Sequence, residues 1–247
     1  MNSFEKTVSP RYTNTSSNQT TTNLPKLYLI TNRNLSKQGE VSDVKEALES
    51  GIKIIQYREK ESSEDHILKK AKELKKLTKK HNALLIINDH PKIAEQIGAD
   101  GIHIGQEDMP IKEAVKIFSG KIIGVSVSTI EEAKQADEDG ATYLGIGPIF
   151  DTGTKKDAGK GIGLEKIRQI KKQTTLPIVA IGGINKTNTE EVLKTGADSV
   201  AVISAIIGKN IKKETLSLLK IINQYTLGQK KTIKYKDIAK HINNTKI

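Results

Sequence analysis

The chain has 247 residues, which is enough for one large domain such as an α/β barrel of about 250 residues. It contains no Cys, so disulfides, thiolate metal sites and a Cys nucleophile are excluded, and it has no run of about 18 apolar residues that could span a membrane. The formal net charge of +11 is concentrated at the two ends of the chain, so nucleic acid is not the expected partner, and the composition fits a cytoplasmic protein.

Residues 1–24 are rich in Ser, Thr and Asn and lack apolar periodicity. Such a segment buries too little apolar surface to offset the entropy that ordering would cost. We therefore predict a disordered extension over 1–24. Because the segment has no apolar stretch, it is not expected to be a cleaved secretion signal.

From Leu27 onward, short runs rich in Ile, Val and Leu alternate with longer amphipathic stretches. The predicted strands cover residues 27–31, 53–58, 84–88, 101–104, 122–127, 143–149, 178–181 and 199–203. The predicted helices cover 43–49, 63–80, 92–97, 111–118, 130–138, 164–173 and 189–195, with a closing helix over 215–226. This alternation predicts a parallel sheet, because each helical crossover returns the chain to the same end of the sheet.

A faint internal repeat supports the count of strands. Predicted helices stop at Gly51, Gly98, Gly140 and Gly196, and the last three of these glycines begin Gly-Ala-Asp or Gly-Ala-Thr sequences that lead into a strand. Glycine just past a helix end is the usual left-handed cap. Since the stop recurs before every second strand, we predict a (β/α)8 TIM barrel over 25–227, in preference to an open doubly wound sheet.

The chain beyond Gly228, which is expected to end the closing helix, is strongly basic. Residues 228–247 contain six Lys and a single Asp, and their weak apolar pattern fits either a short docked helix or a basic tail. We assign 228–247 as a basic C-terminal extension. The sequence is compatible with a homo-oligomer and does not fix the oligomeric state.

The active site of such a barrel lies at the carboxyl ends of its strands, and polar residues end nearly every predicted strand. Gln56, Arg58 and Lys60 fall on one side of the second strand because side chains alternate with a period of two. The apolar pair Ile54-Ile55 leads in from the predicted interior, where two cations are costly without an anion. An anion site is therefore predicted, in preference to a charged edge strand.

Asp89 and Asp108 end the third and fourth predicted strands, which are neighbours in the barrel. Two adjacent carboxylates repel each other unless a cation lies between them, and hard oxygen ligands suit Mg²⁺ shared with a phosphate. The alternative is helix capping, because each Asp lies two residues before a proline, Pro91 or Pro110, that could open a helix.

A second group of anion-binding candidates follows the sixth, seventh and eighth strands. The loop after the sixth strand carries Thr152, Thr154 and Lys155, and small residues such as Gly183 and Ser204 follow the other two. Loops after strands seven and eight often form a phosphate cradle in this architecture. The sequence thus predicts two anion sites, one at strands two, three and six and one at strands six, seven and eight.

Several of these segments resemble the thiamine phosphate synthase family, also called thiamine-phosphate pyrophosphorylase. The resemblance covers about residues 26–226, and its order and spacing follow the predicted barrel. It is carried by QYREK at 56–60, IND at 87–89, GADGIHIGQEDMP at 98–110, GVS at 124–126, GIGPIFDTGTKKDA at 145–158, AIGGI at 180–184 and GADSVAVISAI at 196–206.

The resemblance implies a transferase that joins 4-amino-2-methyl-5-hydroxymethylpyrimidine diphosphate to 4-methyl-5-(2-phosphoethyl)thiazole, releasing pyrophosphate in a dissociative, Mg²⁺-assisted reaction. Residues implied to hold the pyrimidine diphosphate are Gln56, Arg58, Lys60, Asn88, Ser126 and Lys155, of which Arg58, Lys60, Ser126 and Lys155 are the implied catalytic residues. Mg²⁺ would be held by Asp89 and Asp108. The thiazole phosphate would be held by Thr152, Thr154, Gly183, Ile203 and Ser204.

One departure from the family pattern bears on the alternatives. Ser128 stands where relatives often carry His, the residue on which the related thiazole tautomerase would rely. A tautomerase-like isomerase and a non-catalytic thiazole phosphate sensor are the competing functions, and both fit the predicted Mg²⁺ and diphosphate residues less well. His103 lies close to these groups, as either a functional or a structural histidine. A nucleic-acid role of the basic extension is a separate alternative.

Overall fold

The computed structural model of the protein describes residues 24–154 and 159–244, with side chains described as far as residue 229. The strands are β1 (Leu27–Ile30), β2 (Ile54–Tyr57), β3 (Leu84–Asn88), β4 (Gly101–Ile104), β5 (Ile122–Val127), β6 (Tyr143–Ile146), β7 (Ile178–Ile181) and β8 (Ser199–Val202). The helices are α1 (Glu40–Glu49), α2 (Glu64–Lys80), α3 (Pro91–Gln96), α4 (Ile111–Ile117), α5 (Ile130–Glu138), α6 (Leu164–Lys171), α7 (Thr189–Lys194) and α8 (Ile211–Asn244).

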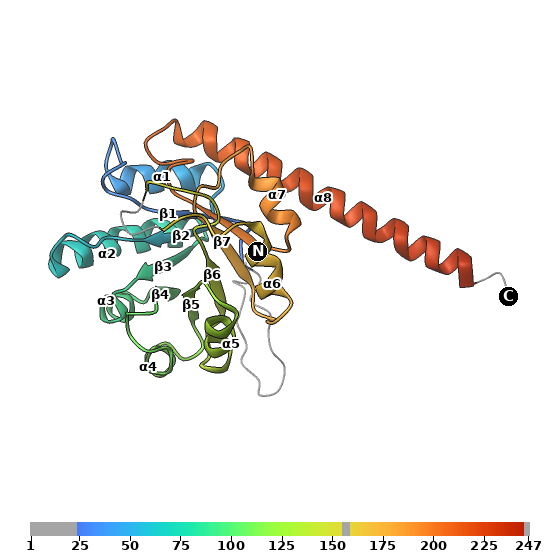
Figure 1. Ribbon diagram of the computed structural model, residues 1–247. Helices are drawn as coiled ribbons and strands as arrows, with labels where there is room; N and C mark the ends of the chain where they lie inside the picture. The colour runs from blue at the N-terminus through green and yellow to red at the C-terminus, as the bar shows by residue number, and fades with distance from the viewer. Residues whose placement is uncertain (1–23, 155–158, 245–247) are drawn as a thin grey trace, which may run out of the picture.

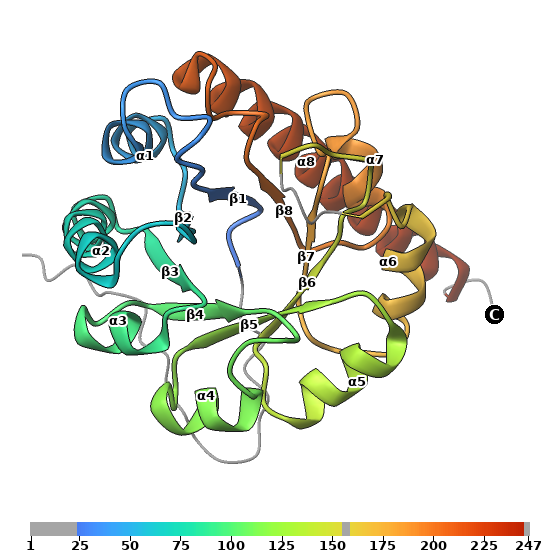
Figure 2. The same ribbon diagram turned by 60° about the vertical axis from the view of Figure 1, so that its left-hand side comes forward.

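The eight strands form a closed parallel barrel in chain order, and β8 pairs with β1 to close it. Figure 2 shows the helices outside the ring of strands. The predicted (β/α)8 TIM barrel is confirmed, and apart from the closing helix the predicted elements agree with the observed ones to within a few residues. The clearest difference among the strands is β6, which ends at Ile146 rather than at residue 149. It ends there because Pro148, which follows Gly147, has no N–H to give to a strand ladder.

Leu24 corrects the predicted extension over 1–24 by one residue. Its side chain is buried and belongs to the apolar cluster inside the barrel, next to Tyr28 and Ile30 of β1. The rest of the predicted extension, residues 1–23, lies outside the described residues.

The four glycine stops adopt the left-handed conformation that the repeat predicts. Gly51, Gly98, Gly140 and Gly196 have φ values between +62° and +106°. Side chains other than hydrogen are disfavoured at such φ values, so glycine is the residue that turns the chain from each of these helices into the next strand.

The third residue of each Gly-Ala-Asp or Gly-Ala-Thr sequence joins two neighbouring strands at the amino end of the barrel. Backbone N–H groups of Leu85, Ile123 and Ile178 donate to Asp100 Oδ2, Thr142 Oγ1 and Asp198 Oδ2, at 2.8, 2.9 and 2.9 Å respectively. We call these three segments the amino-end turns. The repeat therefore marks a structural device, because each turn supplies an acceptor to the strand before it.

Apolar side chains form two layers, one between the strands and the helices and one inside the barrel. Along the inner face, side chains change from apolar near the amino end to polar near the carboxyl end. Ile86 is followed two residues later by Asn88 in β3, and Ile122 is followed four residues later by Ser126 in β5. The period of two therefore brings the polar residues of several strands together at one end.

Helix α8 runs without a break from Ile211 to Asn244, and Figure 1 shows that it extends beyond the barrel. The prediction that Gly228 ends this helix is wrong. A glycine inside a helix costs only about 1 kcal/mol relative to alanine, which is too little to stop a helix that is already packed. The predicted boundary between the barrel domain and the basic extension therefore falls inside one helix.

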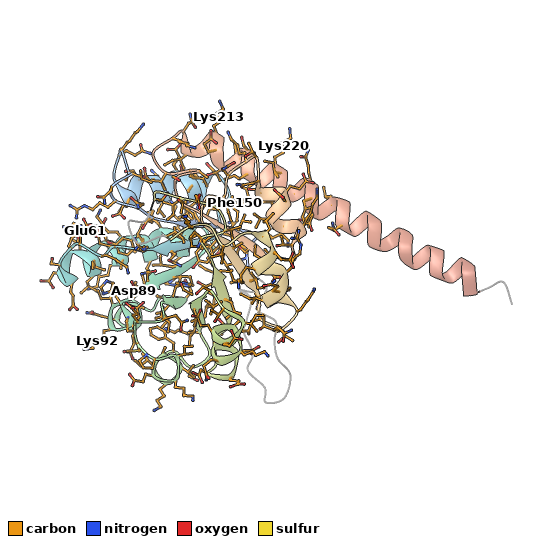
Figure 3. The ribbon with its side chains drawn as sticks, viewed as in Figure 1. Glu61, Asp89, Lys92, Phe150, Lys213 and Lys220 are labelled. Atoms are coloured by element: carbon orange, nitrogen blue, oxygen red, sulfur yellow. The ribbon has the colours of Figure 1, made fainter. Side chains whose placement is uncertain are left out.

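The first half of α8 packs on the barrel through one face. Leu218 and Ile222 are buried on that face, whereas Lys213 and Lys220 point away from the barrel in Figure 3. In the part of the chain that the structure describes, no helix combines the length and the apolar character needed to cross a membrane.

Candidate active site

Two cavities open at the carboxyl ends of the strands. The β2–β5 cavity has a volume of about 700 Å³, and its lining includes Gln56, Arg58, Lys60, Asn88, Asp89, His103, Asp108 and Ser126. The β6–β8 cavity has a volume of about 800 Å³, and its lining includes Ser126, Thr152, Thr154, Gly183, Ile203 and Ser204. The two cavities adjoin, because both are lined by Ser126, Gly145, Ile181 and Ala201.

Positive charge enters the β2–β5 cavity from the segment that follows β2. Gln56 is buried and its Nε2 donates to the Tyr28 hydroxyl at 3.1 Å, while Arg58 is half-buried and Lys60 is exposed. Lys60 Nζ lies 3.2 Å from Asp89 Oδ2. Among the described residues, no carboxylate lies within ion-pairing distance of the Arg58 guanidinium. An anionic ligand in this cavity would give the guanidinium such a partner.

Asp89 and Asp108 face each other across the carboxyl ends of β3 and β4, and Figure 3 shows Asp89 where β3 leads into α3. Burial raises the pKa of Asp89 above its usual value, and the hydrogen bond and negative charge of Asp108 raise it further. Partial burial would also raise the pKa of Asp108, but hydrogen bonds with Asp89 and the Gly105 N–H outweigh it and lower that pKa. The Gly105 N–H donates to Asp108 Oδ2 at 2.6 Å.

The alternative that both aspartates cap helices is wrong. The N-cap residues of α3 and α4 are His90 and Pro110, and neither helix has a side-chain cap from Asp89 or Asp108. Asp89 instead has a φ of +59°, a left-handed conformation that is uncommon outside glycine. Such strained residues are frequent at functional sites, and here the strain belongs to one of two facing carboxylates.

The two carboxylates suit a hard cation. No group of three or more His, Cys, Asp or Glu side chains placed to hold a metal occurs within residues 24–154 and 159–229. Mg²⁺ does not require such a cage, because it commonly binds one or two carboxylates and keeps other positions for water and substrate phosphate oxygens. Asp89 and Asp108 therefore match Mg²⁺ shared with a phosphorylated ligand better than a metal held by protein alone.

Hydroxyl groups gather in the β6–β8 cavity. Thr152 Oγ1 donates to Thr154 Oγ1 at 3.2 Å, and Thr154 Oγ1 lies 3.2 Å from Ser204 Oγ. These hydrogen bonds join the loop after β6 to the loop after β8. The three hydroxyls form a neutral donor set that suits a phosphate monoester. The predicted Lys155 lies outside the described residues.

Gly183 shows why glycine occupies the end of β7. Its φ is +65°, and a Cβ at this position would lie 2.7 Å from Phe150 Cβ in the loop after β6. Two residues that the sequence interpretation missed support this turn, because the Asn185 and Asn188 side-chain amides donate to the Gly183 carbonyl at 3.2 and 3.0 Å. Their spacing forms no motif that could have identified them.

Tyr28 and Tyr143, which the sequence interpretation also missed, lie with His103 beneath the β2–β5 cavity. His103, which the sequence left as either functional or structural, contacts the Tyr143 hydroxyl through Nδ1 at 2.8 Å and Ser126 Oγ through Nε2 at 2.9 Å. Tyr143 and Tyr28 are buried in the barrel, and their hydroxyls are 3.0 Å apart. Gly124 in β5 could have indicated these contacts from the sequence, since an isolated glycine in a strand often marks a place where another group packs close to the backbone.

Ser128 has a helix-capping environment. Its hydroxyl donates to Glu132 Oε2 at 3.0 Å, and its backbone N–H donates to the same oxygen at 2.6 Å. Glu132 also completes the capping box of α5 with Thr129. The position where relatives often carry His is therefore occupied here by a residue that is tied to the start of α5.

The fold and the two adjoining cavities define a (β/α)8-barrel enzyme for small, negatively charged substrates. A family model described as thiamine monophosphate synthase matches residues 27–206. The chain belongs to this family.

Individual relatives agree with the family model. The chain is 48% identical to a thiamine-phosphate synthase from Methanosarcina barkeri, over 80% of this chain and 90% of the relative. It is 46% identical to a thiamine-phosphate synthase from Pyrococcus furiosus, over 81% of this chain and 95% of the relative. A solved structure of thiamine phosphate pyrophosphorylase from Pyrococcus furiosus superimposes with a TM-score of 0.75 and 45% identity, covering 81% of this chain and 96% of that one.

Proposed function

We infer that the protein is a transferase of thiamine biosynthesis that condenses two small molecules to form thiamine phosphate. Membership of the family supports this activity directly. The observation that carries the residue assignments is the pair of adjoining cavities. The substrates we propose are 4-amino-2-methyl-5-hydroxymethylpyrimidine diphosphate and 4-methyl-5-(2-phosphoethyl)thiazole.

Each substrate fits one of the two cavities by its charge. The diphosphate needs cations and a metal, which the β2–β5 cavity offers through Arg58, Lys60 and the aspartate pair. The monophosphate fits the hydroxyl cluster of the β6–β8 cavity. Because Ser126 and Gly145 line both cavities, the reacting ends of the two substrates would meet at this shared wall.

The proposed reaction requires no nucleophilic side chain. The C–O bond between the pyrimidine methylene and the diphosphate breaks, and its electron pair leaves with the diphosphate. The thiazole nitrogen then uses its lone pair to form the new C–N bond to the methylene. Arg58, Lys60 and Lys155 would stabilise the charge that develops on the diphosphate, and Ser126 would position the pyrimidine.

Mg²⁺ is the proposed cofactor, and Asp89 and Asp108 are the residues that would hold it. The support is chemical: two facing carboxylates beside cationic side chains suit a hard ion shared with phosphate oxygens. When bound, Mg²⁺ would neutralise part of the negative charge of the diphosphate. Lys60, which lies beside Asp89, would add a second positive charge on the same side.

Two other functions fit the site less well. A thiazole tautomerase would rely on an acid or base at position 128, where Ser128 instead donates to Glu132 at the start of α5. A non-catalytic sensor of thiazole phosphate would not need Arg58, Lys60 and both aspartates in a separate cavity. We propose the cytoplasm as the compartment and the two small-molecule substrates as the partners. A homo-oligomer remains a prediction, and the mass of the protein in solution would test it.

The direct test uses the purified full chain with both substrates and Mg²⁺, and measures thiamine phosphate and pyrophosphate. We expect equal amounts of the two products, and none when either substrate is omitted. Removal of Mg²⁺ with a chelator should stop the reaction, and added Mg²⁺ should restore it. A complete mixture that yields no thiamine phosphate would contradict the proposed activity, whereas activity that survives chelation would contradict only the metal.

A further inference from the structure

A continuous chain of hydrogen bonds runs beneath the β2–β5 cavity and links Gln56 to Ser126. Gln56 Nε2 donates to the Tyr28 hydroxyl at 3.1 Å, and the hydroxyls of Tyr28 and Tyr143 are 3.0 Å apart. The Tyr143 hydroxyl lies 2.8 Å from His103 Nδ1, and His103 Nε2 lies 2.9 Å from Ser126 Oγ. We call these five residues the tyrosine–histidine chain.

The barrel is built to accommodate this chain. His103, Gly124 and Tyr143 are neighbours in register on β4, β5 and β6. Because Gly124 has no side chain, the rings of His103 and Tyr143 stack in front of it, with centroids 5.5 Å apart and planes inclined by 30°. Any Cβ at position 124 would overlap the Tyr143 ring, and a Cβ at Gly145 would lie 2.9 Å from His103 Cε1.

The chain can be given a direction in which each hydroxyl donates its single proton to the next member. Burial raises the pKa of both Tyr28 and Tyr143, so the two phenols stay protonated. The Gln56 amide nitrogen can only donate, so Tyr28 accepts from it, and we assign Tyr28 as the donor in its contact with the Tyr143 hydroxyl, where either oxygen could donate. In this direction Tyr143 donates to His103 Nδ1, and the ring proton of His103 then lies on Nε2.

The last member of the chain is therefore fixed as well. His103 Nε2–H donates to Ser126 Oγ, so the hydroxyl proton of Ser126 is directed to another acceptor. Ser126 lines both cavities, where a substrate can supply that acceptor. A ring nitrogen of an aminopyrimidine is such an acceptor. A ring N–H of a pyrimidinone is a donor, so it could not form a hydrogen bond with the Ser126 O–H.

We propose that Tyr28 and Tyr143 are positioning residues that hold His103 in its Nε2–H tautomer and thereby make Ser126 a hydrogen-bond donor to the pyrimidine ring. The proposed order of protons involves contacts within the protein only and needs no substrate. Only the identity of the acceptor rests on the proposed function, so the two can fail separately.

The first test needs no substrate. Long-range ¹H–¹⁵N NMR distinguishes the two neutral histidine tautomers by the shifts of the ring nitrogens, and His103→Asn assigns the signals of this residue. We expect the Nε2–H tautomer in the unmodified chain and a mixture in Tyr28→Phe and Tyr143→Phe. Tyr28→Phe is the sharper variant, because the hydrogen bonds of the chain join Tyr28 to His103 through the Tyr143 hydroxyl.

The matched control is Tyr225→Phe, which removes a hydroxyl that donates to the Leu193 carbonyl outside the barrel interior. Its His103 signals should match those of the unmodified chain. The Nδ1–H tautomer in the unmodified chain would overturn the proposal, as would signals that stay unchanged in both Tyr28→Phe and Tyr143→Phe. Because no turnover is needed, this result is independent of whether the proposed reaction is correct.

The second test is kinetic. Tyr28→Phe should lower kcat/KM for the pyrimidine diphosphate by about 3- to 10-fold, the loss expected of one weakened hydrogen bond, and leave the thiazole phosphate KM unchanged. In a Ser126→Ala background, the same substitution should have no further effect, because the hydroxyl that it orients is gone. Equal losses for both substrates would show a merely structural role. A loss that persists in that background would show that Tyr28 acts through its other neighbour, Gln56, and would also overturn the proposal.

Discussion

The two ends of the barrel treat charge in opposite ways. At the amino end, charges are matched: Asp100 Oδ2 accepts from Lys75 Nζ at 2.7 Å as well as from a backbone N–H. At the carboxyl end, two carboxylates, Asp89 and Asp108, face each other, and the Arg58 guanidinium has no carboxylate partner among residues 24–154 and 159–229. The groups named at the amino end are paired without a ligand, whereas those at the carboxyl end would be paired by the charged ligands that we propose.

This difference separates stability from function along one set of strands. Groups in the amino-end turns are paired within the folded chain, so their removal should cost stability and leave turnover intact. At the carboxyl end, Lys60 pairs with Asp89, but Asp89 also faces Asp108, and Arg58 has no carboxylate partner among the described residues. The like charges and the unpaired cation are unfavourable for folding and useful for binding. Removing them should cost turnover and leave the melting temperature unchanged or slightly higher.

The largest expected effect is that of Arg58→Met. Loss of one charge that stabilises the leaving diphosphate should lower kcat by about 10²–10³, with no loss of melting temperature. The control is Arg168→Met, which removes an Arg paired with Glu165 on the exposed side of α6. Steady-state kinetics measures kcat, and thermal unfolding measures the melting temperature. An Arg58→Met enzyme with normal turnover and a lower melting temperature would contradict the functional role of this end of the barrel.

The aspartate pair should show the next largest effect. Asp89→Asn and Asp108→Asn should each raise the Mg²⁺ concentration for half-maximal turnover by about 10- to 100-fold, because each removes a charge from the proposed metal site. Asp65→Asn, at the start of α2, is the control. Metal titrations of activity provide the measurement, and unchanged metal dependence in both variants would remove these residues from the site.

Asp100→Ala tests the amino end. The substitution leaves the Leu85 N–H and Lys75 without their acceptor, so unfolding free energy should fall by about 1–3 kcal/mol while kcat and both KM values stay the same. Chemical denaturation measures this loss. Glu165→Ala is the control, because its exposed pair with Arg168 should contribute about 0–1 kcal/mol. If the Asp100→Ala protein folded but lost activity, stability and function would not be separated between the two ends of the barrel.

Ser204→Ala should have a smaller effect that is confined to one substrate. It removes one neutral hydroxyl from the β6–β8 cavity, worth about 0.5–1.5 kcal/mol, so the thiazole phosphate KM should rise by about 2- to 10-fold. The pyrimidine diphosphate KM and kcat should not change. Ser217→Ala on α8, where the hydroxyl bonds to the Lys213 carbonyl, controls for loss of a serine. If only the pyrimidine diphosphate KM rose, the proposed assignment of each substrate to its cavity would be wrong.

Tyr57→Phe should have the smallest effect and tests the outer face of β2. The Tyr57 hydroxyl is buried without a hydrogen-bond partner in the part of the chain described, and Glu40 and Glu59 lie nearby. Its removal should leave the free energy of unfolding unchanged or raise it by up to about 1 kcal/mol, with normal turnover. Tyr225→Phe, which loses a hydrogen bond, should be slightly destabilised. A clear loss of stability in Tyr57→Phe would mean that its hydroxyl is paired.

Much of the fold and part of the site could be predicted from local sequence signals. Strands were recognisable because apolar runs such as Ile54-Ile55 end in polar residues, and the barrel because Gly51 and its three equivalents stop every second helix. The period of two then indicated which side Gln56, Arg58 and Lys60 share. These signals are local, since they depend on backbone conformation and on the alternation of side chains along one strand.

Only the tertiary structure decided how residues from different strands meet. Asp89 and Asp108 were equally compatible with helix caps until the fold brought their carboxyl groups together. Gly124 gained its meaning from the register that stacks His103 and Tyr143 in front of it. Strand register, ring packing and the shared wall of the two cavities all depend on contacts between distant parts of the chain. No local pattern of residues specifies such contacts.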